Sequence, residues 1–485
     1  MYTVSKATTT VLAALLLGGC ATLAPDYQRP PAPVPDSWPS KAADTPQAQQ
    51  DARAAADLEW RAYFNDAALQ RLIELALENN RDLRVAALNV EKVQAQYRIQ
   101  RADLLPSVDA SAGYSAQRAL FTLSGNDSTR SSHEYAVDLG FSAWELDLFG
   151  RLRSLKDQAL EQYLASEQAT RSTRISLVAE VASAYLTWSA DAERLRLAQE
   201  TLASQSESYA LTRRSFEVGV ASELDARQAQ TSVDAARVDV AAFTALVAQD
   251  RNALALLLGT PVPADLLPAA PDQLRDVMSE LSVGLPGEVL LQRPDVQQAE
   301  HALLAANANI GAARAAFFPS ITLTASAGTA SDSLSGLFAS GSGTWSFLPQ
   351  VTLPIFNAGS NRAHLRVAEV ERDMLVAQYE KRIQTAFREV ADALALRSNI
   401  DNQLAAQRSL TDATAVTYQL SEVRYRGGID SYLNVLDAQR ALYSAQKNLI
   451  ATQLSRSTNL VTLYKVLGSG WQEADSAPDA IAVAR

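Results

Sequence analysis

Two very long stretches contain neither glycine nor proline, and they limit what this chain can fold into. The first runs from Arg151 to Val218, and the second from Ser360 to Arg426. As one helix, either stretch would be roughly 100 Å long at a rise of about 1.5 Å per residue. Helices of compact domains average about 11–12 residues. We therefore expect long helices that line a tube, with a coiled-coil seam in the first stretch that includes Val178, Val181, Tyr185 and Trp188.

An internal tandem repeat covers most of the chain. Gly219 to Leu224 is echoed by Gly428 to Leu433, and Leu258-Gly259 by Leu467-Gly468, at the same offset along the sequence in both cases. A helix-to-strand junction at Pro106 returns at Pro319, at nearly that offset. Repetition of several landmarks at nearly one offset indicates a duplicated structural unit.

Alternating apolar and polar residues follow both junction prolines, a pattern typical of strands. The predicted strands span residues about 107–121, 133–146, 320–331 and 344–355, with small polar loops at 124–128 and 336–343. Four strands per chain are too few to close a barrel, which needs about eight. If the apolar face meets lipid, several chains must contribute strands to one barrel.

The N-terminus reads as a short secretory signal that ends in cysteine. Lys6 precedes an apolar run from Val11 to Leu17, and Leu17-Gly18-Gly19-Cys20 resembles a bacterial lipoprotein box. Cys20, the only cysteine, is therefore the predicted site of S-diacylglycerol and N-acyl (palmitate-type) attachment. A signal with an incidental cysteine is the alternative.

The composition argues against several classes of function. A net charge of −11 and a pI near 5.0 disfavour nucleic-acid binding. His133, His301 and His364 are scattered and have no cysteine near them, so no metal site is predicted. Ser444-Ala445-Gln446-Lys447 matches S-x-x-K but lacks its partner motifs. We predict no catalytic residues, no enzyme activity and no cofactor other than the lipid on Cys20.

Several motifs, in order along the chain, resemble the outer membrane factor family, the TolC-like efflux channel lipoproteins, and among them the OprM/NodT-type subgroup. Besides the lipoprotein box, they are Trp144 to Arg151 (WELDLFGR), Leu353 to Gly359 (LPIFNAG) and Ala315 to Ser320 (AAFFPS). The resemblance implies an α+β membrane protein. It implies a homotrimer with 3 × 4 = 12 strands in an outer-membrane β-barrel, continued by an α-helical barrel through the periplasm.

The resemblance also implies a function. The chain would be the passive exit channel of a tripartite multidrug efflux pump, with a periplasmic membrane fusion adaptor and an inner-membrane RND transporter as partners. A channel for type I protein secretion or metal efflux is the alternative, and a periplasmic coiled-coil adaptor is a weaker one. The predicted segments are a signal peptide (1–19), a lipidated extended arm (20–57), a first repeat (58–258), an inter-repeat equatorial collar (259–292), a second repeat (293–468) and a flexible tail (469–485).

The long helices are expected to turn back at glycines, and these turns form the predicted periplasmic tip. The tip residues are Gly219, Ser222, Gly427, Gly428 and Ser431. Ser222 and Ser431 are the expected N-caps of the returning helices.

Leu433 and Asp437 lie four residues apart, so they share one helical face. In a threefold assembly that face would bring rings of leucines and aspartates to the axis, as in closed tips of the family. We therefore predict a gate at Leu433, Asp437 and Tyr432, with Tyr432 or Arg440 as polar partner of the aspartate. Asp437 as an ordinary surface charge is the alternative.

Overall fold

The structure is a computed structural model of the whole chain, and it describes residues 22–39, 59–123, 126–266, 278 and 286–468. The chain forms two compact units, and neither is a continuous stretch of sequence. The first comprises residues 1–31, 89–167 and 298–380, and the second residues 32–88, 168–297 and 381–485. Each unit takes segments from both predicted repeats, so the compact units cut across the repeats of the sequence. Cys20, much of the predicted collar and the predicted tail lie outside the described residues.

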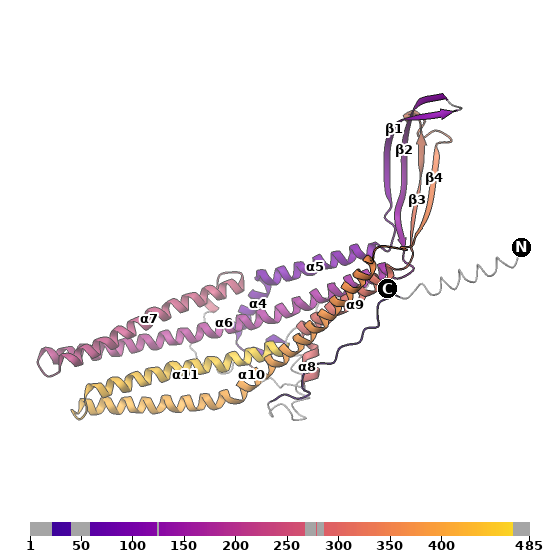
Figure 1. Cartoon of the computed structure of the whole chain (residues 1–485). Helices are drawn as coiled ribbons and strands as arrows, with labels where there is room; N and C mark the ends of the chain where they lie inside the picture. The colour runs from indigo at the N-terminus through magenta and orange to yellow at the C-terminus, as the bar shows by residue number, and fades with distance from the viewer. Residues whose placement is uncertain (1–21, 40–58, 124–125, 267–277, 279–285, 469–485) are drawn as a thin grey trace. The chain divides into compact units, whose positions relative to one another are not determined.

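One four-stranded antiparallel sheet belongs to the first unit. Its strands are β1 (Asp109–Leu123), β2 (Asn126–Leu146), β3 (Ser320–Ser331) and β4 (Gly343–Thr352), paired in the order β1-β2-β3-β4. Figure 1 shows the two hairpins side by side. The two hairpins of the sequence are therefore joined through the β2–β3 ladder.

Two details of the sheet differ from the sequence prediction. Asn126, Asp127 and Ser128, predicted as loop, are paired in β2 against β1, because antiparallel partners bond through backbone groups that every residue carries. The fourth strand ends at Thr352, earlier than the predicted residue 355.

The long helices have the same lengths in both repeats. Helix α6 (Arg151–Glu217) and helix α10 (Ser360–Arg426) contain 67 residues each. The returning helices α7 (Glu223–Leu258) and α11 (Tyr432–Leu467) contain 36 residues each. Shorter helices are α3 (Trp60–Tyr63), α4 (Ala67–Asn79), α5 (Arg81–Ala102), η2 (Ala264–Leu266), α8 (Pro286–Gln292), α9 (Pro294–Ala315) and η4 (Leu334–Gly336).

The core of the second unit gathers around the seam that the sequence predicts. Val181 and Tyr185 of α6 are buried with Leu72 of α4 and Leu254 of α7. Tyr63 stacks on Tyr464 of α11, with 5.2 Å between ring centroids, and its hydroxyl donates a hydrogen bond to the Leu460 carbonyl. This core therefore packs helices α4, α6, α7 and α11 against one another and against the short helix α3.

The ends of α7 and α11 are held in the same way, which shows the duplication in three dimensions. Gly259 and Gly468 follow the two helices in the left-handed conformation, with φ of 67° and 72°. The Asn80 side chain donates to the Leu257 carbonyl at 2.8 Å. Arg293 donates to the Val466 carbonyl, which occupies the equivalent position in the second repeat, at 2.6 Å. Equivalent joints therefore use different side chains to satisfy the same helix-end carbonyl.

The described part of the N-terminal arm, residues 22–39, contains no helix or strand and packs along α9. Arg29 forms a two-pronged ion pair with Glu300 at 2.6 and 3.0 Å. Asn307 donates to the Pro25 carbonyl at 2.7 Å, and Arg314 to the Leu23 carbonyl at 3.2 Å. A side chain at Gly311 would come within 2.7 Å of the Ala24 nitrogen. The arm is thus fastened to the first unit over several residues.

Candidate functional site

One face of the sheet is mostly apolar where all four strands pair, because apolar residues of neighbouring strands lie directly opposite one another. Tyr114 faces Tyr135, and Ala112 faces Val137. Across the other ladders the same face carries Leu139 opposite Ala327, Phe141 opposite Ala325, Ile321 opposite Val351 and Ala325 opposite Phe347. The exposed fractions are 57% for Leu139, 55% for Phe347 and 65% for Val351. This face is thus uncovered within one chain, as a surface built for lipid would be.

The opposite face of the sheet is mostly polar. It carries Ser111 opposite Asp138, Gly140 opposite Ser326, and Ser326 opposite Ser346, whose hydroxyls bond at 2.8 Å. Leu348 of β4 is an apolar residue on this face, and it is 62% exposed. The alternation gives one lipid-compatible and one water-compatible face, as in strands of membrane barrels.

Both outer edges of the sheet are open. Within the described residues, β1 pairs only with β2 and β4 pairs only with β3. Each outer edge therefore presents backbone N–H and C=O groups without a strand partner.

Two ion pairs fix the turn from β2 into α6. A bulge between Phe141 and Trp144 interrupts the ladder. Beyond it, Arg151 bonds Glu145 at 2.8 and 2.6 Å, and Arg153 bonds Asp147 at 3.1 Å. The motif from Trp144 to Arg151, one of those that resemble the family, is thus a strand-to-helix junction held by ion pairs. Both arginines are paired charges. No helix of the described residues has the length and apolar character of a membrane span.

The two helix turns of the second unit lie at the same end of that unit (Figure 1). At the first turn, Gly219 has φ of 79°. Ser222 caps α7 in a capping box, in which Asp225 N–H donates to the Ser222 hydroxyl at 3.1 Å and the Ser222 N–H donates to the Asp225 carboxylate at 3.2 Å. Such a box satisfies two of the helix's free N–H groups.

The second turn is closed by an ion pair that sequence inspection missed. Gly427 and Gly428 follow α10, and Gly428 has φ of 71°. Ser431 stands at the N-cap of α11, but its side chain makes no cap hydrogen bond. Arg424 instead binds Asp430 across the turn at 2.5 and 3.1 Å. The hydrogen bond from Arg424 holds the pKa of Asp430 below its usual value. A basic residue six positions before an aspartate, spanning a Gly-Gly turn, is the signal that could have predicted it.

The structure separates the three predicted gate residues. Leu433 is 45% exposed, and the Asp437 side chain is 67% exposed with Arg440 Nη1 at 3.9 Å from its carboxylate. Tyr432 lies on a different face of α11 and is buried with Ala229 and Leu436.

Tyr432 belongs to a cluster of tyrosines from both helical hairpins. Its ring lies 5.3 Å from that of Tyr425, and Tyr209 and Tyr418 pack against the same cluster. Burial raises the pKa of the Tyr432 hydroxyl. Tyr432 therefore packs the hairpins together, and Leu433 and Asp437 are left as an exposed stripe. In the first repeat, Leu224 is exposed and Gln228 half-buried.

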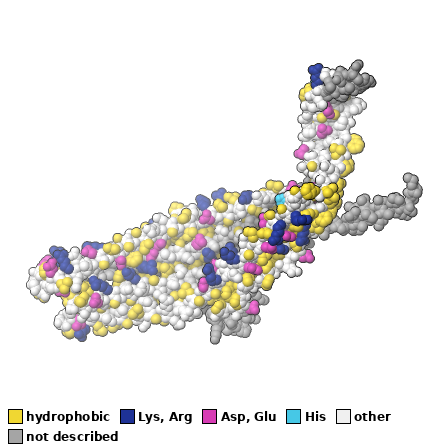
Figure 2. Space-filling view, viewed as in Figure 1, with side chains coloured by type: hydrophobic (Ala, Val, Ile, Leu, Met, Phe, Trp, Pro, Cys, Tyr) yellow, Lys and Arg dark blue, Asp and Glu magenta, His cyan; other side chains and the backbone are white. Residues whose placement is uncertain are grey.

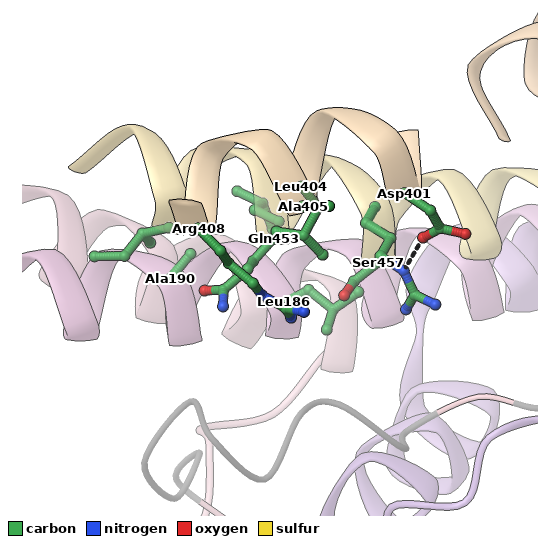
Figure 3. A pocket seen from close by; sticks show the side chains of 11 residues that line it. Leu186, Ala190, Asp401, Leu404, Ala405, Arg408, Gln453 and Ser457 are labelled. Atoms are coloured by element: carbon green, nitrogen blue, oxygen red, sulfur yellow. Dashed lines mark hydrogen bonds and ion pairs between the residues drawn. The ribbon is translucent and has the colours of Figure 1, made fainter. Parts of the chain in front are cut away.

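A cavity of about 300 Å³ lies between α6, α10 and α11 of the second unit (Figure 3). Leu186, Ala190 and Leu404 make part of its apolar wall, and Asp401 pairs with Arg456 at 2.7 Å on its rim. The hydrogen bond from Arg456 lowers the pKa of Asp401. These groups form an ion pair beside aliphatic side chains, and Ser457, Gln453 and Arg408 also line the cavity.

The histidines are dispersed in the structure as well. His301 bonds Glu161 at 2.7 Å, and His133 bonds the Tyr114 hydroxyl at 2.9 Å. Among the described residues, no group of three or more His, Cys, Asp or Glu side chains is placed to hold a metal ion. Charged side chains are instead spread over the helices, while few appear on the visible part of the sheet (Figure 2).

Known proteins resemble this chain over nearly its whole length. The sequence profile of the family described as outer membrane efflux protein matches residues 72–260 and 285–469. The toluene efflux pump outer membrane protein TtgC of Pseudomonas putida is 56% identical over 461 residues, which are 95% of this chain and 94% of TtgC. The outer membrane protein OprJ of Pseudomonas aeruginosa is 45% identical over 466 residues, 96% of each chain.

A solved structure shares the fold. The open state of the MtrE outer membrane channel of Neisseria gonorrhoeae superposes with a TM-score of 0.83 at 41% identity, covering 93% of this chain and 99% of that one. The mixed helical and strand architecture is therefore that of outer-membrane channels.

The apolar face of the sheet yields a test. We expect Phe347→Lys to reduce the amount of protein in the outer membrane, because a lysine on the lipid face costs about 2–4 kcal/mol at mid-depth and less near the interfaces. Gln350→Lys, on the polar face of the same strand, is the matched control and should insert normally. Fractionation and immunoblotting of the outer membrane measure both. Equal losses in the two variants would show that the faces are assigned wrongly.

Proposed function

This chain belongs to the outer membrane efflux protein family, and we propose that three copies of it form the exit channel of a tripartite pump. The single observation that carries the proposal is the sheet: it has one apolar face, one polar face and two open edges. The family is one of efflux channels, and this geometry explains how such a chain can work only as an assembly.

Backbone hydrogen bonding requires the assembly to close. In hydrocarbon every N–H and C=O must find a partner within the protein, so the edges of β1 and β4 have to meet strands of other copies. Two copies would supply about eight strands, whose narrow interior side chains fill. Three copies supply about twelve, which leaves a wider, water-accessible interior on the polar face. A trimer is therefore the smallest assembly that serves as a channel.

The helices continue the channel toward the cell. Each copy contributes α6, α7, α10 and α11, so a trimer would have twelve long helices. Helices of 67 residues are about 100 Å long, enough to cross much of the periplasm. The channel itself would be passive. An inner-membrane RND transporter would supply the energy for transport, and a periplasmic adaptor would join the transporter to the channel.

The relatives of this chain suggest the cargo. Besides the toluene efflux protein TtgC, other Pseudomonas putida relatives are described as antibiotic and solvent efflux pump outer membrane proteins. We infer that this chain passes small lipophilic molecules, including aromatic solvents and antibiotics. A passive channel with a polar wall has little reason to select among them, so selection would lie with the transporter.

The pump assignment is tested by deleting the gene for this chain while leaving its partners intact. Deleted cells should accumulate several-fold more of a lipophilic dye and survive toluene poorly, and a plasmid copy should restore both. Dye accumulation measured by fluorescence is the direct readout. Unchanged accumulation would overturn the pump assignment, and loss of a secreted protein instead would favour type I secretion.

We also propose a gate at the second turn, and the exposed stripe of Leu433 and Asp437 supports it. In a trimer three leucines and three aspartates would converge there. We expect the double variant Leu433→Ala with Asp437→Ala to raise single-channel conductance in planar bilayers several-fold. Leu224→Ala with Gln228→Ala, the equivalent positions of the first repeat, is the control and should change it less. A double variant with wild-type conductance would refute the gate.

We further propose that Cys20 carries the lipid that the lipoprotein box indicates. Two or three acyl chains would anchor the arm stably, and the arm is fastened along α9 only a few residues later. Cys20→Ala, expressed behind a cleavable signal peptide, should lose labelling by radioactive palmitate. Assembly into trimers should persist, because the sheet is a separate membrane anchor. Labelling that survives the substitution would disprove the lipid site.

A further inference from the structure

We propose a specific register for the contact between copies: β4 of one copy pairs antiparallel with β1 of the next, with Ser346 opposite Ser115. This inference rests on the proposed channel assembly and names the surface that makes it. The occupant of each open edge is a second copy of this chain, because β1 and β4 are the two edges that a ring of identical copies brings together.

The registers within one chain fix how the sheet is skewed. Asp109 lies opposite Gly140, Gly140 opposite Ser326, and Ser326 opposite Ser346. A straight line across the sheet from the first residue of β1 therefore reaches Ser346. Strand β4 continues beyond that line, from Ser346 to its last residue, Thr352. Strand β3 reaches the same level at Ser320, which pairs with Thr352, so β1 alone begins six residues above the end that β3 and β4 share.

Face alternation restricts the register between copies. The offset is defined as the number of residues by which the partner of Ser346 lies beyond Asp109 in the next copy. An odd offset would place apolar residues of β4 beside polar residues of β1, because a shift of one residue exchanges the faces. Only even offsets keep one face apolar around the whole ring.

Strand tilt restricts it further. An offset of six residues is a shift of about 20 Å along the strands for every four strands, which are about 19 Å wide, and this gives a tilt of about 45°. An offset of four gives about 35°, and an offset of eight about 55°. Barrel strands tilt by about 35–45°, so offsets of four and six remain. This tilt does not depend on the number of copies, since offset and width grow together.

The strand ends distinguish the two remaining offsets. An offset of six places Thr352, the last residue of β4, opposite Asp109, the first residue of the next β1. An offset of four would place Thr352 opposite Ser107, which lies outside β1 and directly follows Pro106. The offset of six pairs the strands through to their common end.

The side chains fit the same offset. Leu348, an apolar residue on the polar face of β4, would lie opposite Gly113 of the next copy, where a side chain would meet nothing within 4 Å. Trp345, 81% exposed, would lie opposite Ala116. Phe347 would face Tyr114, an aromatic pair of the kind that stabilises neighbouring strands. At these three positions a large residue thus meets a small one or another aromatic.

Disulfide cross-linking tests the register. In the variant Ser115→Cys with Ser346→Cys, mild oxidation of outer membranes should convert most of the protein to covalent dimers and trimers on non-reducing gels after boiling. Within one chain the two positions are about 14 Å apart across three strand spacings and about 20 Å apart along the strands, which is beyond disulfide reach. Any bond between them therefore joins two copies. The unmodified chain, whose only cysteine is Cys20, sets the background.

Two matched controls shift the register by two residues in either direction. Gly113→Cys and Gln117→Cys, each combined with Ser346→Cys, keep the same face, but their positions are diagonal neighbours about 7–8 Å away. They should cross-link several-fold less. Stronger bonding in either control than in the Ser115 pair would overturn the register while leaving the assembly intact.

A second pair of the same register guards against a local defect. Ser111→Cys with Gln350→Cys should also cross-link, because both pairs follow from one offset. If neither pair forms a disulfide while unboiled samples still migrate as trimers, β4 and β1 pair in another register. The register proposal is then wrong, and the proposed trimer stands. If the unmodified chain itself gives no trimer, the proposed channel assembly fails as well.

Discussion

The backbone hydrogen bonds at the two open edges of the sheet are the constraint on which the rest of the molecule depends. Water satisfies an open edge, but hydrocarbon does not, so β1 and β4 can enter a membrane only when strands of other copies pair with them. The apolar face formed by residues such as Leu139 and Phe347 makes that environment favourable. Pairing between identical copies then has to close into a ring. Its strands have to be tilted, because a closed barrel requires strand tilt.

Duplication explains how so long a chain is built from few kinds of contact. Both repeats contain a 67-residue helix and a 36-residue return, and both returns end in a left-handed glycine next to a carbonyl that a distant side chain holds. The helix lengths are equal while the side chains differ: Asn80 does in one joint what Arg293 does in the other. The two repeats need helices of equal length to line one tube together, whereas any suitable hydrogen-bond donor can satisfy a helix-end carbonyl.

The sequence predicted the helices and strand faces well because these depend on local patterns. Absence of glycine and proline set both ends of α6 and α10, and alternation assigned the faces around Val137 and Val351 correctly. The first hairpin was predicted too short, since a polar run such as Asn126 to Ser128 shows no alternation and pairs through its backbone. Contacts between distant segments could not be predicted from the sequence. Arg29 and Glu300 are 271 residues apart, and no local pattern distinguishes either residue. For the same reason the sequence could not show that Tyr432 faces the other hairpin.

That placement of Tyr432 bears on how the tip could move. Its cluster joins α6 and α7 to α10 and α11 through Tyr209, Ala229 and Tyr425, so the two hairpins are packed together just beside the stripe of Leu433 and Asp437. In the proposed gate, three like charges at the axis would repel one another, which would favour an open tip unless packing opposed it. The Arg424–Asp430 pair spans the second turn, and Leu433 and Asp437 lie within helix α11, so the stripe would move with that helix and not as a loose loop. Opening would then require the α10–α11 hairpin to pivot, either breaking the tyrosine cluster or carrying the first hairpin with it.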